Sequence, residues 1–177
     1  MDLFDAMKKR RMHRAFAPDP VPRELMEKLL YAAGRAATAR AGIRQLIVVD
    51  DPVLMATFRQ VCPGFVNNAP NAIAICTDLD VADRVGGRSG IEEVGRIDAG
   101  TAAAHLTLAA PALGLGVCLV TSWTASALRA VLGAPAYIRP EILMAVGYPA
   151  ATPSQAFKAP PKIVYHNAFG IPWEEAT

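Results

Sequence analysis

The alanine-rich segment DAGTAAAHLTLAAPALGLG, residues 98–116, limits the fold more than any other part of the chain. Alanine is the strongest helix former, and its small side chain lets a helix approach its neighbours closely. Asp98 is placed to cap this helix or to lie in its first turn. Pro111 predicts a kink or an early stop, and Gly114 and Gly116 end the pattern. The segment therefore predicts a helix suited to tight packing.

Four short apolar runs predict buried strands between the helices. They are LIVVDD, residues 72–77, VCLVTSW and PEILMAVGYPA. Helical patterns are expected at residues 2–11, 25–33, 52–62 and 124–133, with Gly133 closing the last. Strands that alternate with helices indicate an α/β-type core with a small sheet.

The 177 residues show no repeat and no convincing linker, so residues 1–177 are expected to form a single domain. One segment departs from the regular patterns. Residues 81–97, VADRVGGRSGIEEVGRI, are polar and glycine-rich. This composition predicts an exposed loop or a lid.

The stretch KKRRMHRAF, residues 8–16, places five cationic side chains within nine positions. A nucleic-acid surface, a small-anion site and a solvated helix end are the three interpretations. The formal net charge of the chain is only +2, which argues against a nucleic-acid partner, because such proteins usually spread basic residues over a whole face.

No apolar run is long enough for a membrane span, and no apolar segment follows the charged N-terminus as in a secretory signal. The three cysteines are far apart and fit neither a zinc site nor a disulfide framework. The sequence therefore predicts no membrane association and a reduced, cytoplasmic setting.

Several motifs occur in the order of a known family. They are RRMHRAF, DPVPRELMEKLLYAAGRAA, the AP pair at residues 69–70, DAGTAAAHLTLAAPALGLGVC and ILMAVGYPA. With these motifs the chain resembles the nitroreductase family of FMN-dependent oxidoreductases, from about residue 3 to residue 165.

The resemblance implies an α+β subunit whose mixed central sheet of four to five strands is flanked by helices. It also implies an interlocked homodimer in which residues 150–177 form an extension that wraps onto the partner. Two FMN molecules would lie at the dimer interface, each in contact with both subunits.

The same resemblance gives the basic segment a role in binding the FMN phosphate and ribityl oxygens. Arg10 and Arg14 match the family's contacts, with Arg11 between them, and arginine offers a rigid fork of donors to a phosphate. Met12 stands where the family usually has serine, so one hydroxyl donor is lost. Lys158, in FKAPPK, matches a basic residue that helps to neutralise the phosphate, although an ordinary surface lysine is an equally good interpretation.

In the family, a backbone N–H at the end of a strand points at flavin N5. By position this donor falls at Val120, Thr121 or Ser122. It needs no particular side chain, although relatives often have glycine where this chain has Thr121.

The segment RAATARAGIRQL differs most from the family, whose members often read Pro-Ser-x-x-Asn-x-Gln-Pro-Trp there. Thr38 replaces the serine, and the asparagine and tryptophan are absent. Arg40, Arg44 or Gln45 would have to supply donors to the flavin carbonyl edge. Asn67 also lies where relatives approach the flavin, with an asparagine turn before a strand as the simpler interpretation.

The function implied by the resemblance is hydride transfer from NADH or NADPH through FMN to an electron-poor small molecule, such as a nitroaromatic or a quinone, in ping-pong fashion. No side chain is expected to act as a catalytic acid or base. The alternatives are flavin fragmentation or reductive dehalogenation in the same fold, a non-catalytic flavin-binding protein, and a nucleic-acid-binding module.

Overall fold

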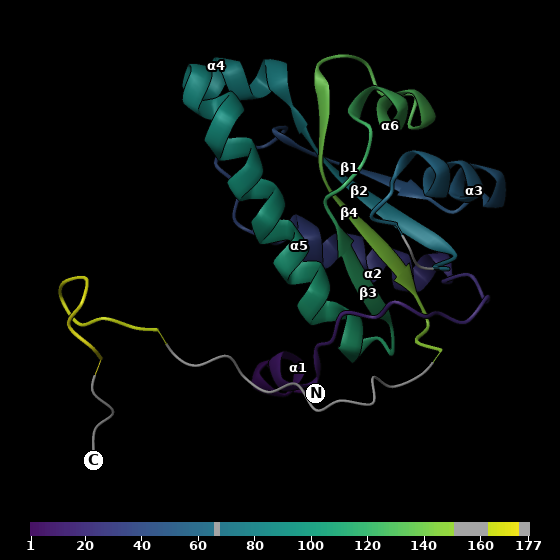
Figure 1. Cartoon of the computed structure of the whole chain (residues 1–177), viewed down its shortest axis with the longest axis horizontal. Helices are drawn as coiled ribbons and strands as arrows, with labels where there is room; N and C mark the ends of the chain where they lie inside the picture. Colours follow the sequence, from purple (N-terminus) through teal and green to yellow (C-terminus); the bar gives the residue numbers. More distant parts are fainter. Residues whose placement is uncertain (66–67, 151–162, 174–177) are drawn as a thin grey trace.

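The computed structural model describes residues 1–65, 68–150 and 163–173. Its centre is a four-stranded sheet in the order β1-β2-β4-β3 (Figure 1). The strands are β1 (Arg44–Val49), β2 (Asn71–Asp78), β3 (Gly116–Val120) and β4 (Ile138–Gly147). All four lie at the apolar runs that predicted them.

The α+β class is confirmed, but the sheet is not mixed within the described residues. All three ladders between neighbouring strands are antiparallel. The only parallel pairing among the described residues is an isolated bridge between Met12 and Val117. Strand direction follows from how the chain connects the strands, which the apolar runs do not record.

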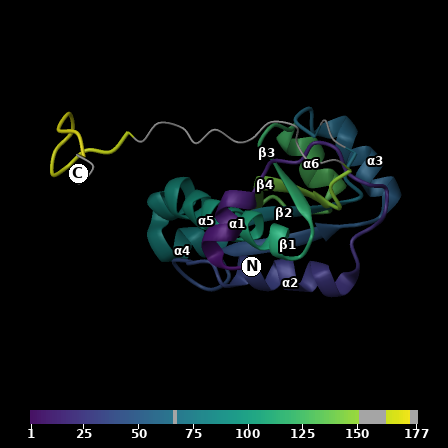
Figure 2. The ribbon, with the colours of Figure 1, turned by 90° about the horizontal axis from the view of Figure 1, so that it is seen from below.

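Helices cover both faces of the sheet. The helices are α1 (Leu3–Lys9), α2 (Arg23–Gly34), α3 (Pro52–Val61), α4 (Leu79–Ser89), α5 (Gly95–Ala112) and α6 (Ala125–Val131). Helices α2 and α5 pack on one face, and α3 and α6 on the other (Figures 1 and 2). Strand β2 serves both layers, because Ile73 and Ile75 face α5 while Ala72 and Ala74 face α3 and α6.

Helix α5 confirms the expectation of close packing. Gly95 lies against β2, where an added Cβ would come within 2.5 Å of the Thr77 side chain. Further along, Ala99, Ala102, Ala103 and Ala110 are buried in the layer shared with α2. Pro111 does not kink the helix midway, because it occupies the last turn, and α5 ends at the next residue.

The prediction of a loop at residues 81–97 is wrong. These residues continue α4, form the short π-helix η1 (Gly90–Val94) and begin α5. Asp78 caps α4 by accepting a hydrogen bond from the Val81 N–H at 3.0 Å. The glycines allow a sharp bend and close packing. Gly87 has φ +54°, and Gly90 lies so close to the Ala82 carbonyl that no Cβ would fit.

After β4, the described residues 163–173 form a short exposed segment. Tyr165 bridges Pro172, and the Trp173 N–H donates to the Val164 carbonyl at 2.8 Å. Every residue of this segment is exposed. Lys158 lies outside the described residues, and wrapping onto a partner stays a prediction.

Candidate functional site

The basic segment runs from the end of α1 along the edge of the sheet. Met12 bridges Val117, and the His13 N–H donates to the Val117 carbonyl at 3.0 Å. Gly116 permits this approach, because an added Cβ would meet the His13 ring at 2.8 Å. The backbone of the segment is therefore docked on β3.

The three arginines of this segment have different surroundings. Arg11 donates to the carbonyls of Lys8 at 2.6 Å and Arg10 at 2.8 Å, so it caps the C-terminal end of α1. Arg14 is exposed. Burial raises the pKa of the Cys118 thiol, and the positive charge of Arg14 opposes that shift. The charge of Arg14 thus reaches Cys118, a residue of β3.

Arg10 borders a shallow groove between α5 and the sheet, with a volume of about 390 Å³. The groove is lined by Arg10, Gly100, Ala103, Ala104, Thr107, Leu108, Leu119 and Ile142. Its walls are mostly small and apolar, and Arg10 supplies the only formal charge among these lining residues. Such a surface suits a flat apolar ring system joined to an anionic group.

The predicted strand-end donor lies where β3 stops. Val120 is buried and pairs with Leu143, whereas Thr121 and Ser122 are exposed and outside the ladder. The Gly64 N–H donates to the Ser122 carbonyl at 3.3 Å, which helps to fix this end. Residues 121–122 thus follow directly after β3 and are exposed, and their role as a backbone donor stays a prediction.

The loop at residues 36–42 is held by hydrogen bonds to two residues outside it, Asp98 and Arg44. Thr38 Oγ1 donates to Asp98 Oδ2 at 2.5 Å, and the Ala39 N–H donates to the same carboxylate at 3.2 Å. Arg44 donates through Nη2 to the Ala36 carbonyl, and through Nη1 to the Ala37 and Asp98 carbonyls, at 3.2 Å in each case.

The side chains of this segment that were predicted as flavin donors differ in the partners that they already have. Arg44 is committed to backbone carbonyls, and Gln45 Nε2 donates to the Gly42 carbonyl at 2.9 Å. Thr38 is bonded to Asp98. Arg40 is exposed and makes no side-chain hydrogen bond or ion pair with the described part of the chain. Asp98 lies in the first turn of α5, as one of its two predicted placements had it, but sequence reasoning missed its contact with this loop.

Asn68 has a structural role. Its Oδ1 accepts from the Phe16 N–H at 2.8 Å, and its Nδ2 donates to the Phe16 carbonyl at 2.7 Å. The amide thus pairs with the backbone of the basic segment as another strand would. Asn67 lies outside the described residues.

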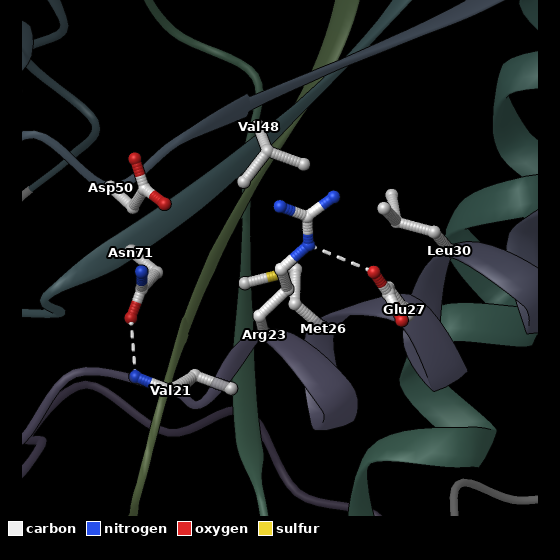
Figure 3. Close-up of a pocket in the computed structure, with 8 residues that line it drawn as sticks. All are labelled: Val21, Arg23, Met26, Glu27, Leu30, Val48, Asp50 and Asn71. Carbon is white, nitrogen blue, oxygen red and sulfur yellow. Dashed lines mark hydrogen bonds and ion pairs between the residues drawn. The ribbon is translucent and has the colours of Figure 1, made fainter.

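A second cavity, of about 340 Å³, lies between α2 and the ends of β1 and β2 (Figure 3). Asn71 lines it and accepts a hydrogen bond from the Val21 N–H at 2.9 Å, and Arg23 pairs with Glu27 across its mouth. None of the predicted site residues lines this cavity.

The cysteines are poor candidates for nucleophiles. Burial raises the pKa of Cys62 to about 11. Burial, together with the charge of Glu141, raises the pKa of Cys76 to about 12. All three cysteines are buried free thiols. The described residues also contain no group of His, Cys, Asp and Glu suited to a metal ion. No helix within the described ranges has the length and apolarity needed to cross a membrane.

The sequence matches the model of the Nitroreductase family over residues 7–60 and 43–148. The chain belongs to the nitroreductase family. Known relatives agree with this assignment. A Methanothermobacter thermautotrophicus protein, named as an NADH dehydrogenase/NAD(P)H nitroreductase, is 30% identical over 86% of this chain and 80% of its own length. The FMN reductase [NAD(P)H] of Bacillus subtilis is 23% identical over 99% of this chain and 77% of its own length.

Solved structures of the nitroreductase family have the same fold. An FMN-dependent nitroreductase from Clostridium difficile superposes with a TM-score of 0.80, at 27% identity, over 94% of this chain and 99% of that one. The groove beside Arg10, the exposed Arg14 of the basic segment and the strand end at residues 120–122 therefore lie on a nitroreductase scaffold.

Proposed function

We propose that this protein is an FMN-dependent oxidoreductase that uses NADH or NADPH to reduce a small, electron-poor acceptor such as a nitroaromatic or a quinone. The observation that carries the proposal is the apolar groove along α5 with Arg10 at its edge. Membership of the nitroreductase family and the names of the relatives, which include an FMN reductase and an FMN-dependent nitroreductase, support the same cofactor.

The residues present suit FMN in both charge and shape. Arg10 and Arg14 would hold the phosphate, because guanidinium groups make charge-assisted hydrogen bonds to phosphate oxygens. The small side chains of Gly100, Ala103 and Ala104 leave room for a flat ring. Met12 bonds to β3 through its backbone, so the hydroxyl lost at this position removes a donor without disturbing the segment.

Bound FMN would supply the hydride chemistry, and the protein would bind and orient it. The backbone at residues 121–122 would donate a hydrogen bond to the reacting edge of the ring. Because the groove is shallow and open, nicotinamide and acceptor would use the same face in turn, which gives ping-pong kinetics. The described residues offer no buried acid–base pair in the groove, so no side-chain proton donor is assigned.

We further propose a homodimer built on α1 and α5. Helix α1 packs on α5 (Figure 2) and exposes Leu3, Phe4 and Met7, and α5 exposes Ile97 at 64%. Exposed apolar side chains on adjacent helices are typical of an interface.

This arrangement would also complete the flavin site. The loop bonded to Asp98 lies at the N-terminal end of α5, whereas the basic segment joins β3, which follows the C-terminal end of α5. A two-fold axis that packs two α5 helices antiparallel would bring the loop of one copy to the arginines of the other.

The visible spectrum of the purified protein tests the cofactor assignment. We expect a yellow protein, or a colourless one that becomes yellow with added FMN, and bleaching when NADH or NADPH is added without oxygen. A protein that stays colourless with FMN would overturn the proposal. Bound flavin that neither nicotinamide reduces would instead indicate a non-catalytic flavin-binding protein. Steady-state kinetics with a quinone and a nitroaromatic then test the acceptor class, with parallel double-reciprocal plots expected.

A further inference from the structure

A buried carboxylate lies directly behind the loop at residues 36–42. Asp98 is only 4% exposed, although it belongs to the first turn of α5. Its two oxygens accept the Thr38 hydroxyl and the Ala39 N–H, and no lysine or arginine of the described residues forms a salt bridge with it. Burying a charge is costly unless hydrogen bonds compensate for it. The loop therefore supplies most of the polar contacts that keep this carboxylate buried.

Two more side chains fix the carbonyl groups of the same loop. Arg44 spans the Ala36 and Ala37 carbonyls from β1, and Thr101 Oγ1 of α5 shares its hydroxyl between the Ala37 carbonyl at 3.0 Å and the Asp98 carbonyl at 2.9 Å. Donors and acceptors from β1 and α5 thus hold residues 36–39 from both sides. The next residue, Arg40, is exposed, and its side chain makes no hydrogen bond or ion pair with the described part of the chain.

We propose that Asp98 is a positioning residue that fixes the backbone at residues 38–39 and thereby presents the Arg40 guanidinium to the flavin. Asp98 does not itself touch the flavin, because its carboxylate is buried and bonded to the loop. Arg40 would donate to the oxygen-bearing edge of the ring, where its charge favours the anionic reduced flavin. The inference about Arg40 rests on the proposed FMN function, whereas the inference that Asp98 holds the loop does not.

Limited proteolysis of the flavin-free protein tests the positioning alone. Trypsin requires an extended, mobile chain, so a fixed loop protects the bond after Arg40. We expect trypsin to cut Asp98→Ala after Arg40 at least about tenfold faster than the native protein. Losing one hydrogen bond to a charged group is enough to make local opening of the loop about tenfold more frequent. Mass spectrometry identifies this cut among those at other basic residues.

Two variants control this experiment. Asp51→Ala removes an aspartate that accepts the Val53 and Leu54 N–H groups at the start of α3, so it lowers stability without touching the loop. It should leave the cut after Arg40 at the native rate. Asp98→Asn keeps an acceptor for the Ala39 N–H and a partner for Thr38, and should stay within about threefold of the native rate.

Titration of the apoprotein with FMN tests the link to Arg40. We expect Arg40→Ala and Asp98→Ala each to weaken FMN binding about tenfold. The double variant should be no weaker than the weaker single variant, because a side chain that acts only through Arg40 has nothing to position once Arg40 is gone. Asp51→Ala should bind FMN as the native protein does.

Four outcomes would overturn the proposal. They are native protection of the Arg40 bond in Asp98→Ala, faster cutting there in Asp51→Ala as well, equal damage in Asp98→Asn and Asp98→Ala, and additive losses in the double variant. Failure of the native protein to bind FMN would overturn the proposed function and the assignment of Arg40, while the proteolysis result would still decide whether Asp98 holds the loop.

Discussion

The basic segment at residues 10–16 and the loop at residues 36–42 are both candidate flavin contacts, but they are built in opposite ways. The basic segment is docked through its backbone, against Val117 and the Asn68 amide, while Arg10 borders the groove along α5 and Arg14 is exposed. The loop is held by side chains from outside, and its own Thr38 is used in that attachment. A binding residue is therefore better recognised by what holds its backbone than by its side chain alone.

The loop should be the more sensitive of the two to loss of a supporting side chain. Arg44→Ala removes one donor from each of three backbone carbonyls, and only the Thr101 hydroxyl remains near those of Ala37 and Asp98. We expect it to lower the free energy of unfolding by about 3 kcal/mol, because acceptors that lose their partners in a partly buried site keep their desolvation cost. Urea denaturation checks this value. The exposed Arg35 is a matched control, and Arg35→Ala should change stability by less than about 0.5 kcal/mol.

The side chains of the basic segment should matter for binding and not for folding. We expect Arg10→Ala and Arg14→Ala each to weaken FMN binding by roughly 1.5–3 kcal/mol, the range for hydrogen bonds to charged groups. Calorimetric titration of the apoprotein gives the affinity. Lys8→Ala should have little effect, since Lys8 is an exposed residue of α1. An equal loss at Lys8 and Arg14 would instead indicate a diffuse positive field.

The backbone of the basic segment should depend on Asn68. Asn68→Ala removes both hydrogen bonds to Phe16, which is only 2% exposed. We expect a loss of about 2 kcal/mol in the free energy of unfolding, because both backbone groups lose their partner. Asn68→Asp keeps the acceptor and loses the donor, so its free energy of unfolding should lie between those of the native protein and Asn68→Ala. If both variants had the same urea midpoint of unfolding as the native protein, the hydrogen bonds between Asn68 and Phe16 would not contribute to stability.

The smallest expected effect concerns pH. Burial lowers the pKa of His13 below its ordinary value of 6.5, and the charge of Arg11 adds to the shift. The unfolded chain therefore binds this proton more readily than the folded one, so stability is full above pH 6.5 and declines as the pH falls below it. His13→Gln should reduce the slope of unfolding free energy against pH in that range. An unchanged slope would mean that groups other than His13 cause the pH dependence of stability.

The sequence predicted the positions of the four strands and of α5 well because their patterns are local, but it did not predict the antiparallel pairing of the strands. Apolar runs mark β1 to β4, and the alanines mark α5. Contacts between residues far apart in the sequence could not be predicted from these local patterns. Asp98 was predicted to cap α5 or to lie in its first turn, and it does lie in that turn, but its carboxylate bonds Thr38 and Ala39, about sixty residues away. Residues 81–97 looked like a loop because glycine usually breaks helices, whereas Gly90 is needed here for close contact with the Ala82 carbonyl.

The two tryptophans of the chain lie in very different places. Trp123 is half-buried just after Ser122 and packs against the layer of α3 and α6, whereas Trp173 is 57% exposed in the segment 163–173. The protein thus contains two intrinsic fluorophores, one beside the candidate flavin site and one on the C-terminal segment. With Trp123 changed to phenylalanine, emission from Trp173 would report whether that segment becomes covered as protein concentration rises. With Trp173 changed to phenylalanine instead, quenching of Trp123 fluorescence would report flavin binding.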